Sequence, residues 1–145
     1  MMIDLDYRVL KYLFNNKEPI KVSQMAHKLG IKHSTLGSCV KRLRTNGYVN
    51  YEPFYDVKLT NKGIEIAKEL LRHEHLVELL FFNELGMTVE EAHAESAKLN
   101  LLLSCNTINK ICEKYGHPKK CPCGEEINNS KNCFCEEISK LDITN

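Results

Sequence analysis

Residues 23–47 constrain the fold most, because they predict two short helices joined by a tight turn. In each half an apolar residue recurs at positions i, i+3, i+4 and i+7, which form one face of a helix. The two apolar faces consist of Val22, Met25, Ala26 and Leu29, and of Leu36, Cys39, Val40 and Leu43. Ser23 is a residue type that caps the start of a helix, and Gly30 is one that ends a helix. We therefore expect a helix pair whose apolar faces point into one core.

The outer face of the second predicted helix is polar and basic. Its residues are Ser34, Thr35, Ser38, Lys41, Arg42 and Arg44. The recognition helix of a helix-turn-helix uses such side chains to reach base edges and phosphates in a major groove. We expect Thr35 and Ser38 to face base edges, and Ser34 and the three basic residues to contact or steer phosphates. The alternative is an ordinary helical hairpin with a solvated basic face.

Two short strand-like runs follow, at residues 48–51 and 57–60 around Pro53, and they predict a small β-hairpin, or wing. A helix predicted over residues 3–16 precedes the pair, so the order of elements predicts a winged helix. Residues 1–60 contain ten Lys and Arg against five Asp and Glu, whereas residues 61–145 contain ten against fourteen. The positive charge thus lies where DNA phosphates would be bound, although the net charge of the whole chain is only +1.

The remaining chain predicts further helices. Thr60 can cap a long helix over residues 61–85, and TVEE at 88–91 is a capping box that starts a helix over residues 89–103. Another helix is expected over residues 106–115. Two apolar runs, LLFF at 79–82 and LNLLL at 99–103, predict the interface of a homodimer.

Composition bounds the class of protein. With 145 residues, 43% hydrophobic and 27% charged, the chain is long enough for one globular core or two small ones. It has neither the apolar segment of a secretion signal nor a run of about 18 apolar residues, so we expect a cytoplasmic protein with no membrane partner. No Gly-rich phosphate loop, catalytic triad or acid–base pair is visible, and we do not expect an enzyme.

Seven cysteines are present, and in a cytoplasmic protein they favour metal binding, reactive thiols or core packing over disulfides. Cys39 and Cys112 lie on apolar helix faces and are expected in the core. Cys121, Cys123, Cys133 and Cys135 could supply four thiolates to zinc or to an iron-sulfur cluster. The alternatives are a disordered tail with free thiols, a redox pair, or a thiol or electron-transfer protein.

The order of these elements resembles the iron-dependent and manganese-dependent repressors of the diphtheria toxin repressor family. The strings that carry the resemblance are DY at 6–7, LTNKG at 59–63, RHEHLVELL, ELGMTVEEAHAESAKL and GHPKKCPCGEEI. The resemblance implies a metal-activated homodimer that binds a palindromic operator in double-stranded DNA and represses metal-uptake genes. It also implies a mainly α fold with a small β-wing. Residues 1–62 would form an N-terminal winged helix-turn-helix, and residues 63–115 a linker helix with a helical dimerisation and metal-binding domain. Residues 116–145 would form a Cys-rich tail.

The metal ligands of the family carry over only in part. One family helix presents ligands at i, i+4, i+7 and i+8, and these positions hold His93, Ala97, Asn100 and Leu101, of which only the first is a good ligand. Three other positions match family ligands. Glu78 matches a ligating Glu, and the ligand one turn earlier corresponds to Glu74 or His75. Asp6 matches an acidic ligand of the manganese-dependent members.

These residues predict a metal site with fewer ligands than in the family, made of nitrogen and oxygen donors, for iron, manganese or zinc. The alternative is that His73, Glu74 and His75 form a solvated helix face and that His93 is a core histidine. Because the helix site lacks three ligands, we expect sensing to depend on the four tail cysteines. A purely structural zinc in the tail is the other possibility.

Overall fold

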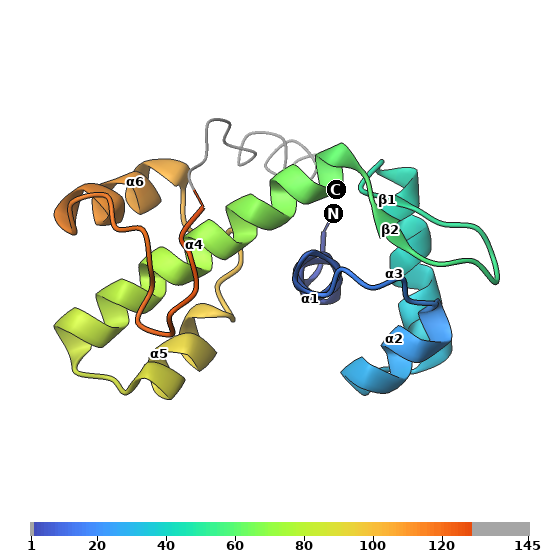
Figure 1. Cartoon of the computed structure of the whole chain (residues 1–145), viewed down its shortest axis with the longest axis horizontal. Coiled ribbons are helices and arrows are strands. Elements are labelled where there is room, and N and C mark those ends of the chain that lie inside the picture. Colours follow the sequence, from blue (N-terminus) through green and yellow to red (C-terminus); the bar gives the residue numbers. More distant parts are fainter. Residues whose placement is uncertain (1, 129–145) are drawn as a thin grey trace. The chain divides into compact units, whose positions relative to one another are not determined.

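The computed structural model describes residues 2–128 and is mostly helical, with one two-stranded sheet (Figure 1). The chain forms two compact units, one of which is Ile3–Ala67, while the other contains Met2 and the residues from Lys68 onward. No helix within the described residues is both long and apolar enough to span a lipid bilayer.

The first unit is a winged helix, as predicted. It contains α1 (Asp4–Asn15), α2 (Val22–Leu29), α3 (His33–Thr45) and the strands β1 (Val49–Asn50) and β2 (Lys58–Leu59). The strands pair antiparallel, with Val49 opposite Leu59, and form the base of the wing.

Helices α2 and α3 form because their apolar faces are buried together. All four predicted apolar residues of α3, including Cys39, are fully buried. Gly30 ends α2 with a φ of 66°, a left-handed conformation that glycine adopts without strain. The predicted Ser23 cap is wrong, because the helix begins at Val22 and the backbone N–H of Lys21 donates to the side chain of Gln24.

Helix α4 (Asn61–Leu85) has the predicted bounds, and it starts in the first unit and continues into the second. The Thr60 hydroxyl accepts a hydrogen bond from the Gly63 N–H at 3.0 Å, which confirms the predicted cap. In the second unit, α5 (Val89–Ser96) begins with the predicted capping box between Thr88 and Glu91, and α6 is Cys105–Lys114.

The prediction that the helix over residues 89–103 is continuous is wrong. Helix α5 ends at Ser96, and residues 97–101 form turns in which Asn100 has a positive φ of 44°. These turns allow Leu99 and Leu103 to pack against the core of the unit. The family positions at Ala97, Asn100 and Leu101 therefore do not continue the helix that carries His93.

The core of the second unit joins α4, α6 and the first part of the Cys-rich tail. It consists of Leu76, Val77, Ile108, Ile111, Cys121 and Ile127. Buried Ile127 therefore anchors the described part of the tail by apolar packing, in addition to the contacts of Cys121. Cys112 packs at the edge of the same core, in agreement with its predicted position.

Candidate functional site

Helix α3 exposes five of the six side chains predicted to contact DNA. They are Ser34, Thr35, Ser38, Lys41 and Arg44. The Ser38 hydroxyl donates to the Ser34 carbonyl at 3.1 Å, so its oxygen can still accept a hydrogen bond from a base edge. The Arg44 guanidinium donates to the Tyr51 carbonyl at 3.1 Å, which links the end of α3 to the wing.

Arg42 is the sixth predicted residue, and it is bonded within the protein. It is half-buried, and its Nη2 lies 2.8 Å from Oδ1 of buried Asp6. The Cys39 thiol donates to the same oxygen at 3.0 Å, and the Ile3 N–H donates to Oδ2 at 3.1 Å. Burial raises the pKa of the Cys39 thiol, so it keeps the proton that it donates. Asp6 thus connects α1 to α3, whereas sequence reasoning assigned it to a metal.

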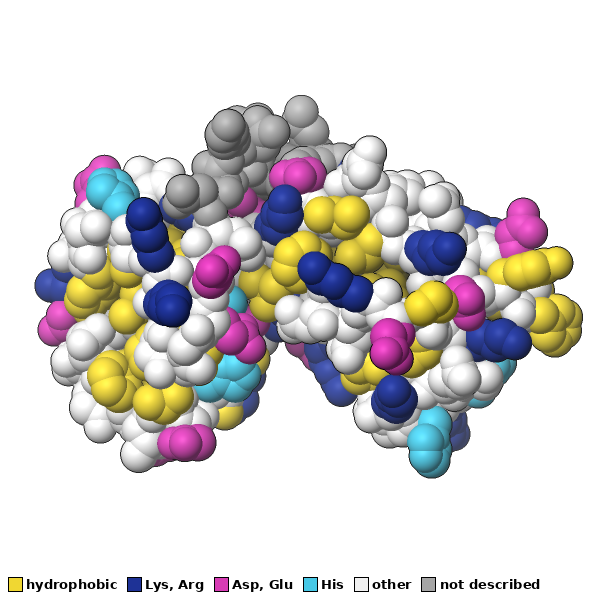
Figure 2. Space-filling model, in the orientation of Figure 1, with side chains coloured by type: hydrophobic (Ala, Val, Ile, Leu, Met, Phe, Trp, Pro, Cys, Tyr) yellow, Lys and Arg dark blue, Asp and Glu magenta, His cyan; other side chains and the backbone are white. Residues whose placement is uncertain are grey.

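A groove of about 500 Å³ lies between α2, α3 and the wing. Its polar and basic lining includes Lys21, Ser23, His33, Lys41 and Tyr51. At the tip of the wing, 92% of Phe54 and 68% of Tyr55 are exposed, and Figure 2 shows apolar side chains projecting there. Helix α3 is thus flanked by an exposed wing and by a groove that carries two lysines in a partly apolar lining, and these lysines suit a contact with a phosphate backbone.

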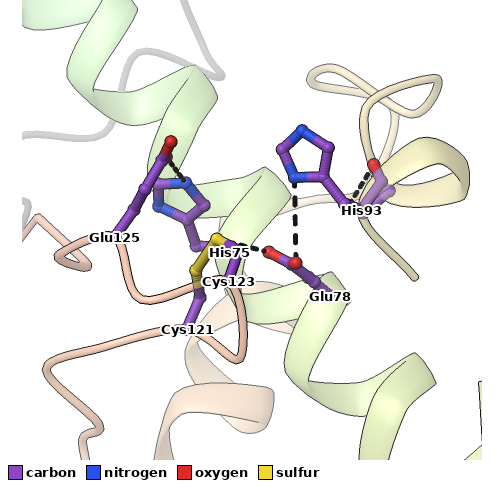
Figure 3. Close-up of a disulfide and its surroundings, with 7 residues drawn as sticks. His75, Glu78, His93, Cys121, Cys123 and Glu125 are labelled. Carbon is purple, nitrogen blue, oxygen red and sulfur yellow. Dashed lines mark hydrogen bonds and ion pairs between the residues drawn. A yellow bond between two sulfur atoms is a disulfide. The ribbon is translucent and has the colours of Figure 1, made fainter. Parts of the chain in front are cut away.

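A second group of functional side chains converges on Glu78, which lies on α4 (Figure 3). This carboxylate is fully buried, and burial raises its pKa. Its Oε1 lies 3.7 Å from Nδ1 of His93 on α5, and its Oε2 lies 3.4 Å from Sγ of Cys123. One ligand atom from each of these three residues lies within 4.8 Å of the others. Carboxylate, imidazole and sulfur are all transition-metal donors.

His75, one turn before Glu78, contacts the same tail segment. Its Nε2 lies 2.8 Å from Oε2 of Glu125, and its ring nitrogen and the sulfurs of Cys121 and Cys123 also lie within 4.8 Å of one another. Cys123 therefore belongs to both clusters. Sequence reasoning missed Glu125, because the segment around it has no helical period that would place its side chain.

Cys121 and Cys123 form a disulfide, contrary to the expectation that the cysteines do not pair. One residue separates them, and the turn of the chain brings their Cα atoms to 5.4 Å, within the range that a disulfide spans. Cys133 and Cys135 lie outside the described residues. The four-cysteine metal or cluster site therefore stays a prediction.

The alternative of a solvated helix face with His93 in the core is wrong, because His73, Glu74 and His75 are all buried, whereas the side chain of His93 is 48% exposed. Glu74 belongs to none of the potential ligand clusters within residues 2–128, nor does Asp6. His73 lies in a further cluster with Glu69 and Cys105. There Arg72 approaches the Glu69 carboxylate to 3.7 Å, and this cation would compete with a metal ion for the carboxylate.

A winged helix with an exposed polar recognition helix, followed by a helical unit with convergent metal donors, defines the class of DNA-binding regulators with a metal-binding domain. Two family profiles match the chain: "Iron dependent repressor, N-terminal DNA binding domain" at residues 8–56, and "Iron dependent repressor, metal binding and dimerisation domain" at residues 60–129. The chain belongs to the iron-dependent repressor family of transcriptional regulators, as the resemblance implied.

Individual relatives agree with this assignment. An uncharacterized HTH-type transcriptional regulator of Methanocaldococcus jannaschii is 37% identical over 108 residues, which cover 73% of this chain and 86% of the relative. The HTH-type transcriptional regulator MntR of Lysinibacillus sphaericus is 30% identical over 101 residues, which cover 70% of this chain and 72% of the relative. A solved structure titled as a manganese-dependent transcriptional repressor in complex with manganese has a TM-score of 0.78 at 25% identity, covering 88% of this chain and 60% of that one. These matches do not support the alternative of a thiol or electron-transfer protein.

Proposed function

We propose that this chain is a metal-activated repressor of metal-homeostasis genes that binds a double-stranded DNA operator as a homodimer in the cytoplasm. The observation that carries the proposal is that one chain combines the exposed polar face of α3 with a cluster of metal donors around the buried carboxylate of Glu78. The names of the relatives support it, since they include MntR regulators and a manganese-dependent repressor bound to manganese.

The residues present fit a transition-metal ion. Glu78 and His93 would hold it, because a buried carboxylate oxygen, Oε1 of Glu78, has no hydrogen-bond partner and lies 3.7 Å from the His93 ring. The ion would place a positive charge beside this buried carboxylate and so compensate its negative charge, and it would link α4 to α5. Iron, manganese and zinc all accept carboxylate and imidazole donors.

DNA binding is tested by the charge on α3. We expect Lys41→Ala to weaken operator binding, because this exposed cation lines the groove beside the wing. The slope of log affinity against log salt should become shallower by about 0.9 for each phosphate that the variant no longer neutralises. Fluorescence anisotropy over a salt series measures both quantities.

Metal activation is tested by removing the metal ion. Adding a chelator to the wild-type protein should lower its affinity for the operator by roughly 5- to 150-fold, the usual range of allosteric coupling.

The matched control is Lys110→Ala, which removes the same charge from an exposed position on α6 in the other unit. It should leave the salt slope unchanged. Equal reductions in affinity for both variants would show that α3 does not bind the DNA, and an affinity that is insensitive to chelator would rule out metal activation.

Dimerisation is proposed to use Leu102, which is 79% exposed, whereas Leu99 and Leu103 of the same run pack inward. Leu102→Glu should weaken the dimer on the order of 1,000-fold, because the burial of two leucine side chains, one from each copy, is worth about 2 kcal/mol each. Sedimentation equilibrium measures the dissociation constant. Phe54→Glu on the wing is the control and should remain dimeric, while a dimeric Leu102→Glu variant would contradict the proposed interface.

A further inference from the structure

We propose that the Cys123 thiolate completes the metal site of α4 and α5, so that reduced protein binds thiophilic ions through sulfur. This inference rests on the proposed function and assigns a further ligand to the same site. The sequence predicted two separate metal sites, one on the helices and one on the tail cysteines, whereas this inference places ligands from both in a single site. The ligands are Cys123, Glu78 and His93, with His75 as the nearest fourth donor.

The geometry around Cys123 carries the inference. Its sulfur lies 3.4 Å from Oε2 of Glu78 and belongs to both ligand clusters, one with Glu78 and His93 and one with His75. Two ligand atoms on one tetrahedral zinc ion are roughly 3.5 Å apart, as follows from zinc–nitrogen and zinc–sulfur bond lengths. The clusters, whose atoms lie within 4.8 Å of one another, need only a small contraction to reach this spacing.

The state of Glu78 points to a missing ligand. A disulfide sulfur has no proton, so the contact between Cys123 and Oε2 is not a hydrogen bond, and Oε1 has no hydrogen-bond partner either. A fully buried carboxylate normally has such partners, because its desolvation is costly. A cation between Cys123 and Glu78 would satisfy both groups.

The disulfide with Cys121 must open before Cys123 can bind a metal ion. An external dithiol reduces it: the Sγ–Sγ bond breaks, both cysteines gain a proton and an electron, and the dithiol is oxidised to its own disulfide. The ion then displaces the proton of the Cys123 thiol and binds the thiolate. The oxidised protein keeps only the nitrogen and oxygen donors of the site.

The test titrates full-length protein with Co²⁺ after treatment with a dithiol, which is removed before the titration, and follows the near-ultraviolet absorption of a cobalt–thiolate bond. Reduced wild-type protein should show this band, and protein not treated with dithiol should not. Cys123→Ser should abolish the band and weaken Zn²⁺ binding by about 100-fold or more, since even changes beside metal ligands cost 10- to 100-fold. Its Mn²⁺ affinity should change far less, because manganese prefers oxygen donors.

Two further variants make the outcome decisive. Cys121→Ser removes the disulfide partner, so it should bind Co²⁺ with the thiolate band whether or not the protein is treated with dithiol. Cys112→Ser, a free half-buried cysteine outside both clusters, should behave like the wild type. A thiolate band that persists in Cys123→Ser, or its absence from reduced wild-type protein, would overturn the inference.

Operator binding, measured in parallel, separates this inference from the proposed function. Metal-dependent DNA binding without a thiolate band would leave the repressor proposal standing and refute the sulfur ligand. A thiolate band without any effect of metal on DNA binding would do the reverse.

Discussion

Substituting Gly63 with Ala should lower the stability of the winged-helix unit by about 3 kcal/mol, at the upper end of the usual cost of overpacking. Gly63 is buried in the first turn of α4, and a Cβ there would overlap the backbone carbonyl of Tyr48. That carbonyl accepts the Thr60 N–H at 3.0 Å and cannot move without breaking the junction between wing and helix. Urea denaturation followed by circular dichroism measures the change in stability.

Gly37 provides the matched control, because it is also a helical glycine but has no atom within 4 Å of the position that a Cβ would take. Gly37→Ala should stabilise the unit by up to about 1 kcal/mol through its higher helix propensity. If Gly63→Ala were as stable as Gly37→Ala, the close approach of α4 to Tyr48 would not exist in solution.

Replacing Asp6 with Ala should destabilise the same unit by about 3 kcal/mol, because it removes several hydrogen bonds to one buried carboxylate at once. The substitution leaves the Ile3 N–H, the Cys39 thiol and the Arg42 guanidinium without their common acceptor. The midpoint of urea denaturation should fall, and operator affinity should fall with it if Arg42 no longer holds α3 against α1.

Asp4→Ala is the control for this substitution, since Asp4 is an exposed acidic residue in the same first turn of α1. Both variants lose a favourable interaction with the positive end of the helix dipole, which is worth at most about 1 kcal/mol. Asp6→Ala in addition removes the hydrogen bonds to a buried carboxylate. Equal destabilisation of the two variants would mean that Asp6 acts through the helix dipole alone.

The Asp6 and Gly63 effects show what sequence patterns report and what they leave out. The period of apolar residues predicted α3 and its buried face, and the caps at Thr60 and Thr88 predicted the starts of α4 and α5. These features depend on residues within about one helical turn, where spacing alone determines which side chains meet. The same helical spacing identified the exposed residues of α3.

Local spacing could not predict the partner of Arg42, because the sequence gives the charge of this residue but not the group that it meets. Asp6 lies 36 positions away, and only the packing of α1 on α3 brings the two together. Nor did it predict the end of α5 at Ser96, because the apolar run LNLLL has no polar period to show which way its residues turn.

The candidate metal centre shows the same division most clearly. The sequence by itself determined that Glu78, His93 and two closely spaced cysteines were candidate ligands, since residue type alone decides which side chains can bind a transition metal. Only the tertiary structure decided that Cys123, 45 positions after Glu78, lies 3.4 Å from its carboxylate. The reason is physical: Ile127 and Cys121 are buried against α4 and α6, and this packing holds the tail segment beside the ligands of the helix.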